Sequence, residues 1–272
     1  MDENYVETAG VRVFCRRAGA GKDVIFLLHG FGASSYSWRH LVAPLSQART
    51  VYAFDLPGFG RSDKPEDFDY SFAGFTRWVL AFMDQHGIEK ASFAGNSMGG
   101  AIATRLAIEH PHRVERLALL GTPTYLHNHP WLTWPLRWPV IGTIYEWLLG
   151  PWAVAMVAPT AFHDRKHVTR ELLDEYGLSL KTAAGRSAVA KFMRNAIPPD
   201  ARALMARYKD LALPILVMRG EHDTVIDARS AARFVKEVRR GRLLSVPDCG
   251  HAVQEERPDV VVPALLEFLE LA

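Results

Sequence analysis

The sequence has few cysteines and no apolar leader. Cys15 and Cys249 are the only two cysteines among 272 residues, and their spacing fits neither a disulfide framework nor a metal site. We interpret both as small buried residues with free thiols, which favours a reducing compartment and a cytoplasmic location. The acidic start at Met1 has no apolar stretch behind it, so we predict no signal peptide.

The sequence also lacks an excess of either charge. Its net charge is +2 at pH 7 and the charges are interspersed, so we expect no nucleic-acid partner. No phosphate loop, dinucleotide fingerprint or metal-ligand pattern occurs, so we expect no cofactor and no metal. The run Trp138–Phe162 carries Glu146 as its only charge, but prolines and glycines interrupt it. We therefore predict no transmembrane segment there.

What is present is an alternation of strand-like and helix-like segments. Val24–Leu28 is a continuous apolar run, typical of a strand buried on both faces. Further strands are predicted at Val11–Arg16, Thr50–Phe54, Ala91–Ala94, Val114–Leu120, Pro214–Arg219 and Leu243–Val246. Helices are predicted at Ser34–Ser46, Phe72–His86 (ended by Gly87), Met98–His110, Ala228–Arg239 and Arg257–Leu271. This order predicts an α/β fold with a mostly parallel central sheet flanked by helices.

The alternation stops in the middle of the chain. From about 123 to 208 we see only helical and loop patterns, so we predict a core of residues 1–122 and 209–272 interrupted by a helical cap at 123–208. The cap is rich in aromatic residues near its start: Tyr125, Trp131, Trp134, Trp138, Tyr145, Trp147 and Trp152. These residues could attach the cap to the core, line an apolar acyl pocket or touch a membrane surface. We interpret His127 and His129 as surface residues.

The six residues GNSMGG at 95–100 contain the pattern Gly-x-Ser-x-Gly of a nucleophile elbow. A strand that turns sharply into a helix leaves its serine in a strained conformation, and glycines on either side leave room for the turn. Ser97 is therefore the candidate nucleophile. The backbone N–H of Met98, at the start of the next helix, is one candidate oxyanion donor.

A second oxyanion donor and an acid–base pair complete the predicted site. HGFG at 29–32 follows a strand and offers the N–H of Phe31, whereas we interpret His29 as structural. A nucleophilic serine needs a base that an acid orients. We assign His251, after the last strand, as the base and Asp223, after the strand before it, as the acid. His222 is the other histidine that could act as the base.

Two carboxylates near Asp223 have other interpretations. Asp227 could cap the next helix, and Glu221 could be a surface residue.

Together these segments resemble the α/β-hydrolase superfamily over nearly the whole chain. The resemblance rests on HGFG at 29–32, DLPGFGRS at 55–62, the elbow at 95–100, GEHD at 220–223 and GH at 250–251. The superfamily orders its triad as serine, acid and histidine, which matches Ser97, Asp223 and His251. The resemblance implies a helical cap over the site. It does not identify the substrate, because this fold hosts many different reactions.

Differences between this sequence and the motifs of individual hydrolase families reduce the number of activities that we expect. Haloalkane dehalogenases and epoxide hydrolases place an aspartate where Ser97 stands, which argues against both activities, whereas peracid chemistry as in cofactor-free haloperoxidases could be a side activity. Carbon–carbon bond hydrolases of ring-fission products have a similar elbow. However, they usually carry a tryptophan at the position of Ala252, and a cap arginine binds their dienoate acid. Arg186 and Arg194 are available for that role, or lie on a solvated helix face.

We therefore predict a metal-free serine hydrolase that cleaves small-molecule carboxylic esters with an apolar acyl or alcohol part, through an acyl-enzyme on Ser97. One alternative is carbon–carbon bond hydrolysis of a vinylogous diketo acid. Another is a small-molecule receptor built on a hydrolase scaffold. The sequence favours no particular oligomeric state, and it leaves open peripheral membrane contact through the tryptophan-rich cap.

Overall fold

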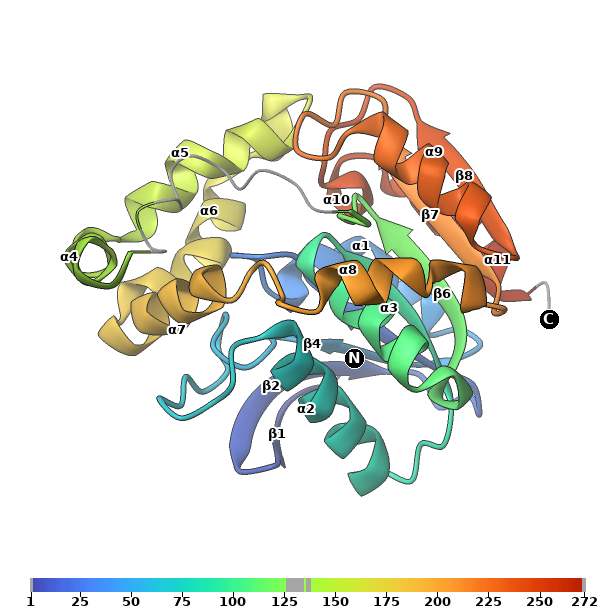
Figure 1. Cartoon of the computed structure of the whole chain (residues 1–272), viewed down its shortest axis with the longest axis horizontal. Helices are drawn as coiled ribbons and strands as arrows, with labels where there is room; N and C mark the ends of the chain where they lie inside the picture. The colour runs from blue at the N-terminus through green and yellow to red at the C-terminus, as the bar shows by residue number, and fades with distance from the viewer. Residues whose placement is uncertain (1, 126–134, 136–137, 271–272) are drawn as a thin grey trace.

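A computed structural model of the chain describes residues 2–125, 135 and 138–270. Its centre is a sheet of eight strands (Figure 1). In spatial order they are β1 (Asp2–Thr8), β2 (Val11–Ala18), β4 (Thr50–Phe54), β3 (Val24–Leu28), β5 (Ala91–Asn96), β6 (Val114–Leu120), β7 (Ile215–Gly220) and β8 (Gly241–Val246). The β1–β2 and β2–β4 pairs are antiparallel and all the others are parallel. The predicted mostly parallel sheet is confirmed.

Helices cover both faces of this sheet, as predicted. Helices α1 (Arg39–Leu45) and α11 (Pro258–Glu270) pack on one face, and α2 (Phe72–Gln85), α3 (Met98–Glu109) and α9 (Ala228–Glu237) pack on the other. Strand β3 contributes to both hydrophobic layers. Ile25 and Leu27 pack in the layer with α1 and α11, whereas Phe26 and Leu28 pack in the layer with α2, α3 and α9. Side chains alternate along a strand, so a strand covered on both sides must be apolar throughout.

Several local features differ from the predictions. Strand β1 was not expected, because most of its side chains are exposed and its pairing with β2 alone holds it at the sheet edge. The predicted helix Ser34–Ser46 divides into a 3₁₀ turn at Ser35–Trp38 and helix α1. Helix α10 (Val253–Glu256) was not expected either.

Cys15 and Cys249 are buried free thiols, as predicted.

The chain between β6 and β7 contains no strand in its described part. It forms α4 (Pro139–Leu148), α5 (Pro151–Ala161), α6 (Arg170–Tyr176), α7 (Ala183–Arg194) and α8 (Ala201–Ala206), with short 3₁₀ turns. Helices α4 to α7 gather on one side of the molecule (Figure 1). We call residues 123–208 the insertion, and its exact boundaries stay a prediction. Trp131, Trp134, His127 and His129 lie outside the described residues.

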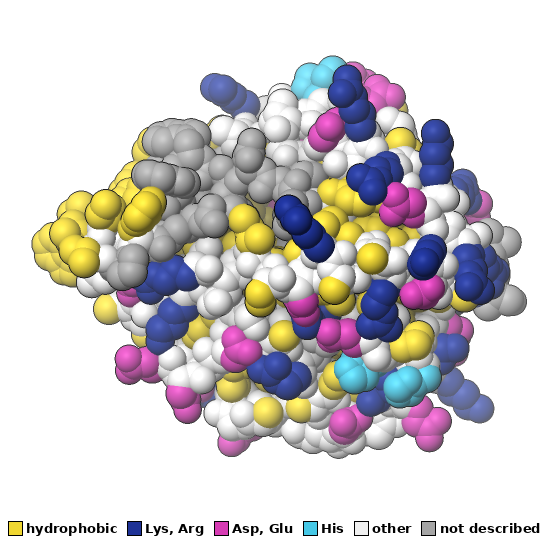
Figure 2. Space-filling model, viewed as in Figure 1, with side chains coloured by type: hydrophobic (Ala, Val, Ile, Leu, Met, Phe, Trp, Pro, Cys, Tyr) yellow, Lys and Arg dark blue, Asp and Glu magenta, His cyan; other side chains and the backbone are white. Residues whose placement is uncertain are grey.

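The α4–α5 corner of the insertion presents large apolar side chains to solvent (Figure 2). We call this set the apolar face: Trp138, Val140, Ile141, Ile144, Trp147, Leu148, Trp152 and Met156. Trp147 is the most exposed of them, at 76%. Of the helices described, none by itself has the length and apolar composition to cross a membrane. The bent pair Val140–Leu148 and Pro151–Ala161, with an angle of 93°, meets those two criteria together.

Candidate active site

Ser97 lies between the last residue of β5 and the first residue of α3. Its φ of 49° and ψ of −113° are unusual for a residue with a side chain, and such a conformation costs about 1–3 kcal/mol. The neighbouring glycines make the turn sterically possible. A Cβ at Gly95 would lie 2.4 Å from the backbone nitrogen of Gly100, and one at Gly99 would lie 2.0 Å from the carbonyl oxygen of Leu28. The local backbone is thus that of the predicted elbow.

Asp223 and His251 meet at the carboxyl ends of β7 and β8. The Nδ1 atom of His251 lies 3.0 Å from Oδ2 of Asp223. The other carboxylate oxygen of Asp223 accepts the N–H groups of Val225 at 2.8 Å and Ile226 at 2.9 Å. Burial raises the pKa of Asp223, but the hydrogen bond from His251 and those from the backbone outweigh it and hold the pKa below its usual range. Asp223 is therefore a buried carboxylate that fixes the orientation of His251.

The other candidates near Asp223 take different places. His222 is exposed, and its ring stacks on His163 with the ring centroids 3.9 Å apart. The side chain of Asp227 accepts the N–H of Arg229 at 3.0 Å and caps α9, as predicted. Glu221 is exposed, also as predicted.

Ser97 and His251 both line a cavity of about 340 Å³ beneath the insertion. Phe31 and Met98, the predicted oxyanion donors, line the same cavity, whereas Asp223 lies behind His251. The remaining walls are mostly apolar: Phe72, Ala101, Ile108, Pro123, Val157, Ala161, Phe192, Met193, Ala196, Ile197, Pro198, Ala201, Leu204, Met205, Val225 and Ile226. A concave apolar cavity with a few convergent polar groups is typical of a small-molecule site.

The predicted oxyanion donors lie on or next to backbone that approaches the serine closely. A Cβ at Gly30 would lie 2.7 Å from Oδ1 of Asn96 and 3.4 Å from Cβ of Ser97, so only a glycine lets this loop come so near. Met98 is the first residue of α3, where backbone N–H groups lack partners within the helix. The oxyanion role of Phe31 and Met98 stays a prediction.

His29 is structural, as predicted. Its Nδ1 lies 2.7 Å from the carbonyl oxygen of Gly30, and its Nε2 accepts the N–H of Leu56 at 2.9 Å. This pattern requires a neutral ring protonated on Nδ1. Burial lowers the pKa of His29, against smaller opposing effects of Gly30 and Asp55, which agrees with a neutral ring.

Two buried carboxylates near the site escaped the sequence prediction. One oxygen of Glu256 accepts the N–H of Gly250 at 2.8 Å, and the other accepts the N–H of Asp164, in the insertion, at 2.6 Å. Glu255 accepts hydrogen bonds from Arg39, at 2.7 Å, and from the hydroxyl of Tyr176. In the sequence QEE at 254–256 the two glutamates have the pattern of an exposed helix start, so nothing there indicates burial.

Arg105 is a third missed residue, and the predicted arginines lie elsewhere. Apart from His251, Arg105 is the only basic side chain among the described residues that line the cavity. It is paired with Glu109 at 2.7 Å and Asp200 at 2.8 Å. Neither Arg186 nor Arg194 lines the cavity.

Comparison with known proteins places this chain in a family. The family described as alpha/beta hydrolase fold matches residues 23–258. This chain belongs to the α/β-hydrolase fold family. A 2-hydroxymuconate semialdehyde hydrolase of a Pseudomonas species is 30% identical over 96% of this chain and 91% of its own length. The pimeloyl-[acyl-carrier protein] methyl ester esterase of Edwardsiella ictaluri is 29% identical over 95% of this chain and 97% of its own.

Solved structures of α/β hydrolases agree with this assignment. The enol-lactonase of Burkholderia xenovorans superposes with a TM-score of 0.83 and 25% identity, covering 98% of this chain and 99% of that one. The predicted superfamily resemblance is thus confirmed over nearly the whole chain. The relatives include both an ester hydrolase and a hydrolase of a semialdehyde.

Proposed function

We propose that this α/β hydrolase cleaves small-molecule carboxylic esters that carry an apolar acyl or alcohol part. The observation that supports the proposal is the largely apolar cavity of about 340 Å³ that contains Ser97 and His251. An apolar acyl chain gains free energy by leaving water for such a cavity. The esterase and the lactonase among the similar proteins, by their names, also act on ester bonds.

In the proposed mechanism Ser97 and His251 exchange one proton in each half of the reaction. Ser97 Oγ attacks the ester carbonyl while His251 accepts the hydroxyl proton, and Asp223 stabilises the resulting imidazolium. The N–H groups of Phe31 and Met98 bind the oxyanion. His251 then protonates the alcohol oxygen as the ester C–O bond breaks. In the second half His251 takes a proton from the attacking water and returns it to Ser97 Oγ as the acyl–serine bond breaks and the acid leaves.

Carbon–carbon bond hydrolysis is the second candidate, because a hydrolase of 2-hydroxymuconate semialdehyde is 30% identical to this chain. A dienoate substrate needs a cation for its carboxylate. Arg105, the one described arginine on the cavity wall, already pairs with Glu109 and Asp200. Because those two carboxylates neutralise its charge, the cavity favours an uncharged ester.

Two further proposals concern the cellular location of the protein and its contact with lipid. The free buried thiols of Cys15 and Cys249 support a cytoplasmic location. The apolar face supports peripheral contact with a lipid surface, because exposed indole rings such as Trp147 favour the boundary between water and lipid.

The decisive experiment measures steady-state hydrolysis of p-nitrophenyl esters from acetate to palmitate. The wild-type chain is compared with Ser97→Ala and with Ser245→Ala, which removes an exposed hydroxyl on β8. We expect a rate maximum at short or medium chains that only Ser97→Ala abolishes. A parallel assay follows the absorbance of a vinylogous diketo acid. Turnover there, with no Ser97-dependent ester hydrolysis at any chain length, would replace this proposal with the second candidate.

A slow single turnover with retained product in both assays would indicate the receptor alternative instead.

A further inference from the structure

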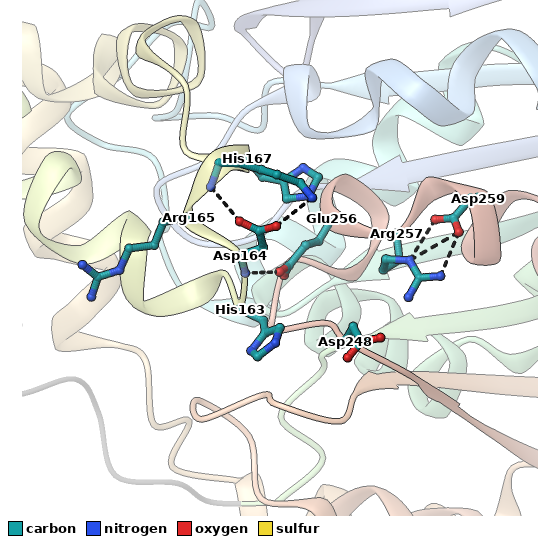
Figure 3. Close-up of a pocket in the computed structure, with 9 residues that line it drawn as sticks. His163, Asp164, Arg165, His167, Asp248, Glu256, Arg257 and Asp259 are labelled. Carbon is teal, nitrogen blue, oxygen red and sulfur yellow. Dashed lines mark hydrogen bonds and ion pairs between the residues drawn. The ribbon is translucent and has the colours of Figure 1, made fainter.

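Three potential metal ligands converge on the surface where the insertion meets the core. His163 follows α5, His222 follows β7 and Asp248 follows β8, and all three side chains are exposed. Their ligand atoms all lie within 4.8 Å of one another. The rings of His163 and His222 are stacked with an interplanar angle of 10°. Figure 3 shows the imidazole of His163 beside the carboxylate of Asp248.

The backbone holds the three ligand-bearing segments together. The N–H of His222 donates to the carbonyl oxygen of Cys249 at 2.9 Å, which ties the loop after β7 to the loop after β8. The carboxylate of Glu256 accepts the N–H of Asp164, next to His163 (Figure 3), and also the N–H of Gly250. Parallel stacked rings point their nitrogen lone pairs side by side, so binding an ion requires the two imidazoles to rotate out of the stack while the backbone stays in place.

We propose that His163, His222 and Asp248 bind a divalent transition-metal ion, with zinc as the representative. Two imidazoles and one carboxylate suit zinc, copper or nickel, whereas magnesium and calcium prefer oxygen ligands alone. Zinc–ligand bonds of about 2.0–2.2 Å in a tetrahedron require ligand atoms about 3.3 Å apart, so the exposed side chains must close by somewhat over 1 Å. Water completes the coordination.

The charges around this cluster are compatible with a cation. Two neighbouring basic groups are paired, Lys166 with Asp164 at 2.7 Å and Arg257 with Asp259 at 2.8 Å, and Arg165 points away from His163 in Figure 3. In Figure 3 Arg257 turns toward Asp259 and away from His163. The carboxylate of Asp248 therefore adds negative charge next to the two imidazoles, and the paired cations nearby oppose an ion only weakly.

A bound ion would join three segments that are distant in the sequence. His163 belongs to the insertion, whereas His222 precedes Asp223 and Asp248 lies in the loop that carries His251. The site would therefore clamp the end of α5 to the two loops that position the acid and the base. An ion that binds only the folded chain stabilises it, whether or not the chain hydrolyses esters.

The test is calorimetric titration of zinc into the untagged full-length chain after removal of metals by chelation. We expect one saturable site, and we expect each of His163→Gln, His222→Gln and Asp248→Asn to weaken binding by more than about 10-fold. Asparagine tolerates a positive φ like the 49° of Asp248, so this variant retains the backbone. His112→Gln is the matched control, because His110 and His112 form a second histidine pair with ring centroids 6.3 Å apart.

Thermal unfolding gives an independent measurement. Zinc at a hundredfold excess over Kd should raise the Tm of the wild-type chain and of His112→Gln by about 5 °C, and magnesium should not. At the same zinc concentration the Tm of His163→Gln should rise by no more than about half as much, because a site that is tenfold weaker is then only in tenfold excess over its Kd. Absence of saturable binding, or equal affinity in the three ligand variants and the control, would overturn the proposal. Neither result depends on the proposed ester hydrolysis.

Discussion

The loops that carry Ser97, Asp223 and His251 and the α4–α5 corner of the insertion differ in how they are held. Hydrogen bonds at several points restrain the loops of the candidate site, and the side chain of Asp223 is completely buried. The α4–α5 corner instead exposes the apolar face to solvent. A fixed geometry is what a chemical step needs, whereas an exposed apolar surface is typical of a site that contacts a partner such as a lipid surface. Substitutions at four positions test this difference.

The largest effect is expected at Ser97. Ser97→Ala removes the nucleophile and should lower kcat by roughly 10⁶-fold, as judged by ester hydrolysis under saturating substrate. Ser97→Gly should lower kcat equally, but it relieves the strain of the positive φ. We expect the free energy of unfolding of the glycine variant, measured by urea titration, to exceed that of the alanine variant by about 1 kcal/mol. Equal stabilities would show that the elbow stores no strain.

Asp223→Asn should have the next largest effect. The asparagine amide keeps the shape but favours the wrong tautomer of His251, so we expect kcat to fall by roughly 10⁴-fold. Asp227→Asn is a matched control, because asparagine also caps a helix and α9 should be unaffected. If both variants keep full kcat, another carboxylate orients the base.

Glu256→Gln tests whether the insertion helps to position the base. A glutamine can accept only one of the N–H groups of Gly250 and Asp164 through its oxygen, so the loop before His251 should shift. We expect kcat to fall by about 10- to 100-fold with a smaller change in KM. Glu267→Gln, at an exposed ion pair with Arg242, should change neither constant. A change in KM alone would indicate that Glu256 acts through the cavity rather than through His251.

The smallest effect on chemistry is expected at the apolar face. Trp147→Ser should leave kcat for a soluble short-chain ester within about twofold, because this side chain is exposed and does not line the cavity. Binding to phospholipid vesicles, measured by sedimentation, should weaken by roughly 10-fold, since burial of a large apolar side chain contributes about 1.5–3 kcal/mol. Leu243→Ser, on β8, is the control. Equal vesicle binding by both variants would remove the lipid surface as the partner of the apolar face.

The predictable parts of the molecule are those in which local pattern and tertiary role coincide. Val24–Leu28 is apolar because both its faces are covered, and the elbow needs its glycines because the backbone at Ser97 leaves no space. Asp227 could be recognised as a cap from its place before a helix. In each case the constraint acts within a few residues of the chain, so the sequence contains it.

The unpredicted parts depend on distant partners. Glu255 and Glu256 are buried only because Arg39, Tyr176 and Asp164 come from other segments. Burial raises the pKa of Glu255, and the contacts with Arg39 and Tyr176 only partly offset it. Strand β1 is likewise defined by its neighbour β2 rather than by its own residues. The apolar face has the composition of a buried helix, and only the fold shows that it is exposed.

The carbonyl oxygen of Ala161, at the end of α5, accepts the N–H groups of His251 at 2.7 Å and Ala252 at 3.2 Å. This contact has a consequence for protein engineering. A chimera that exchanges the insertion between related hydrolases would replace a support of the loop that carries His251 along with one wall of the cavity. Grafts that end before Ala161 would retain the recipient's own support and exchange only the part of the cavity wall that precedes it, such as Val157 and Thr160.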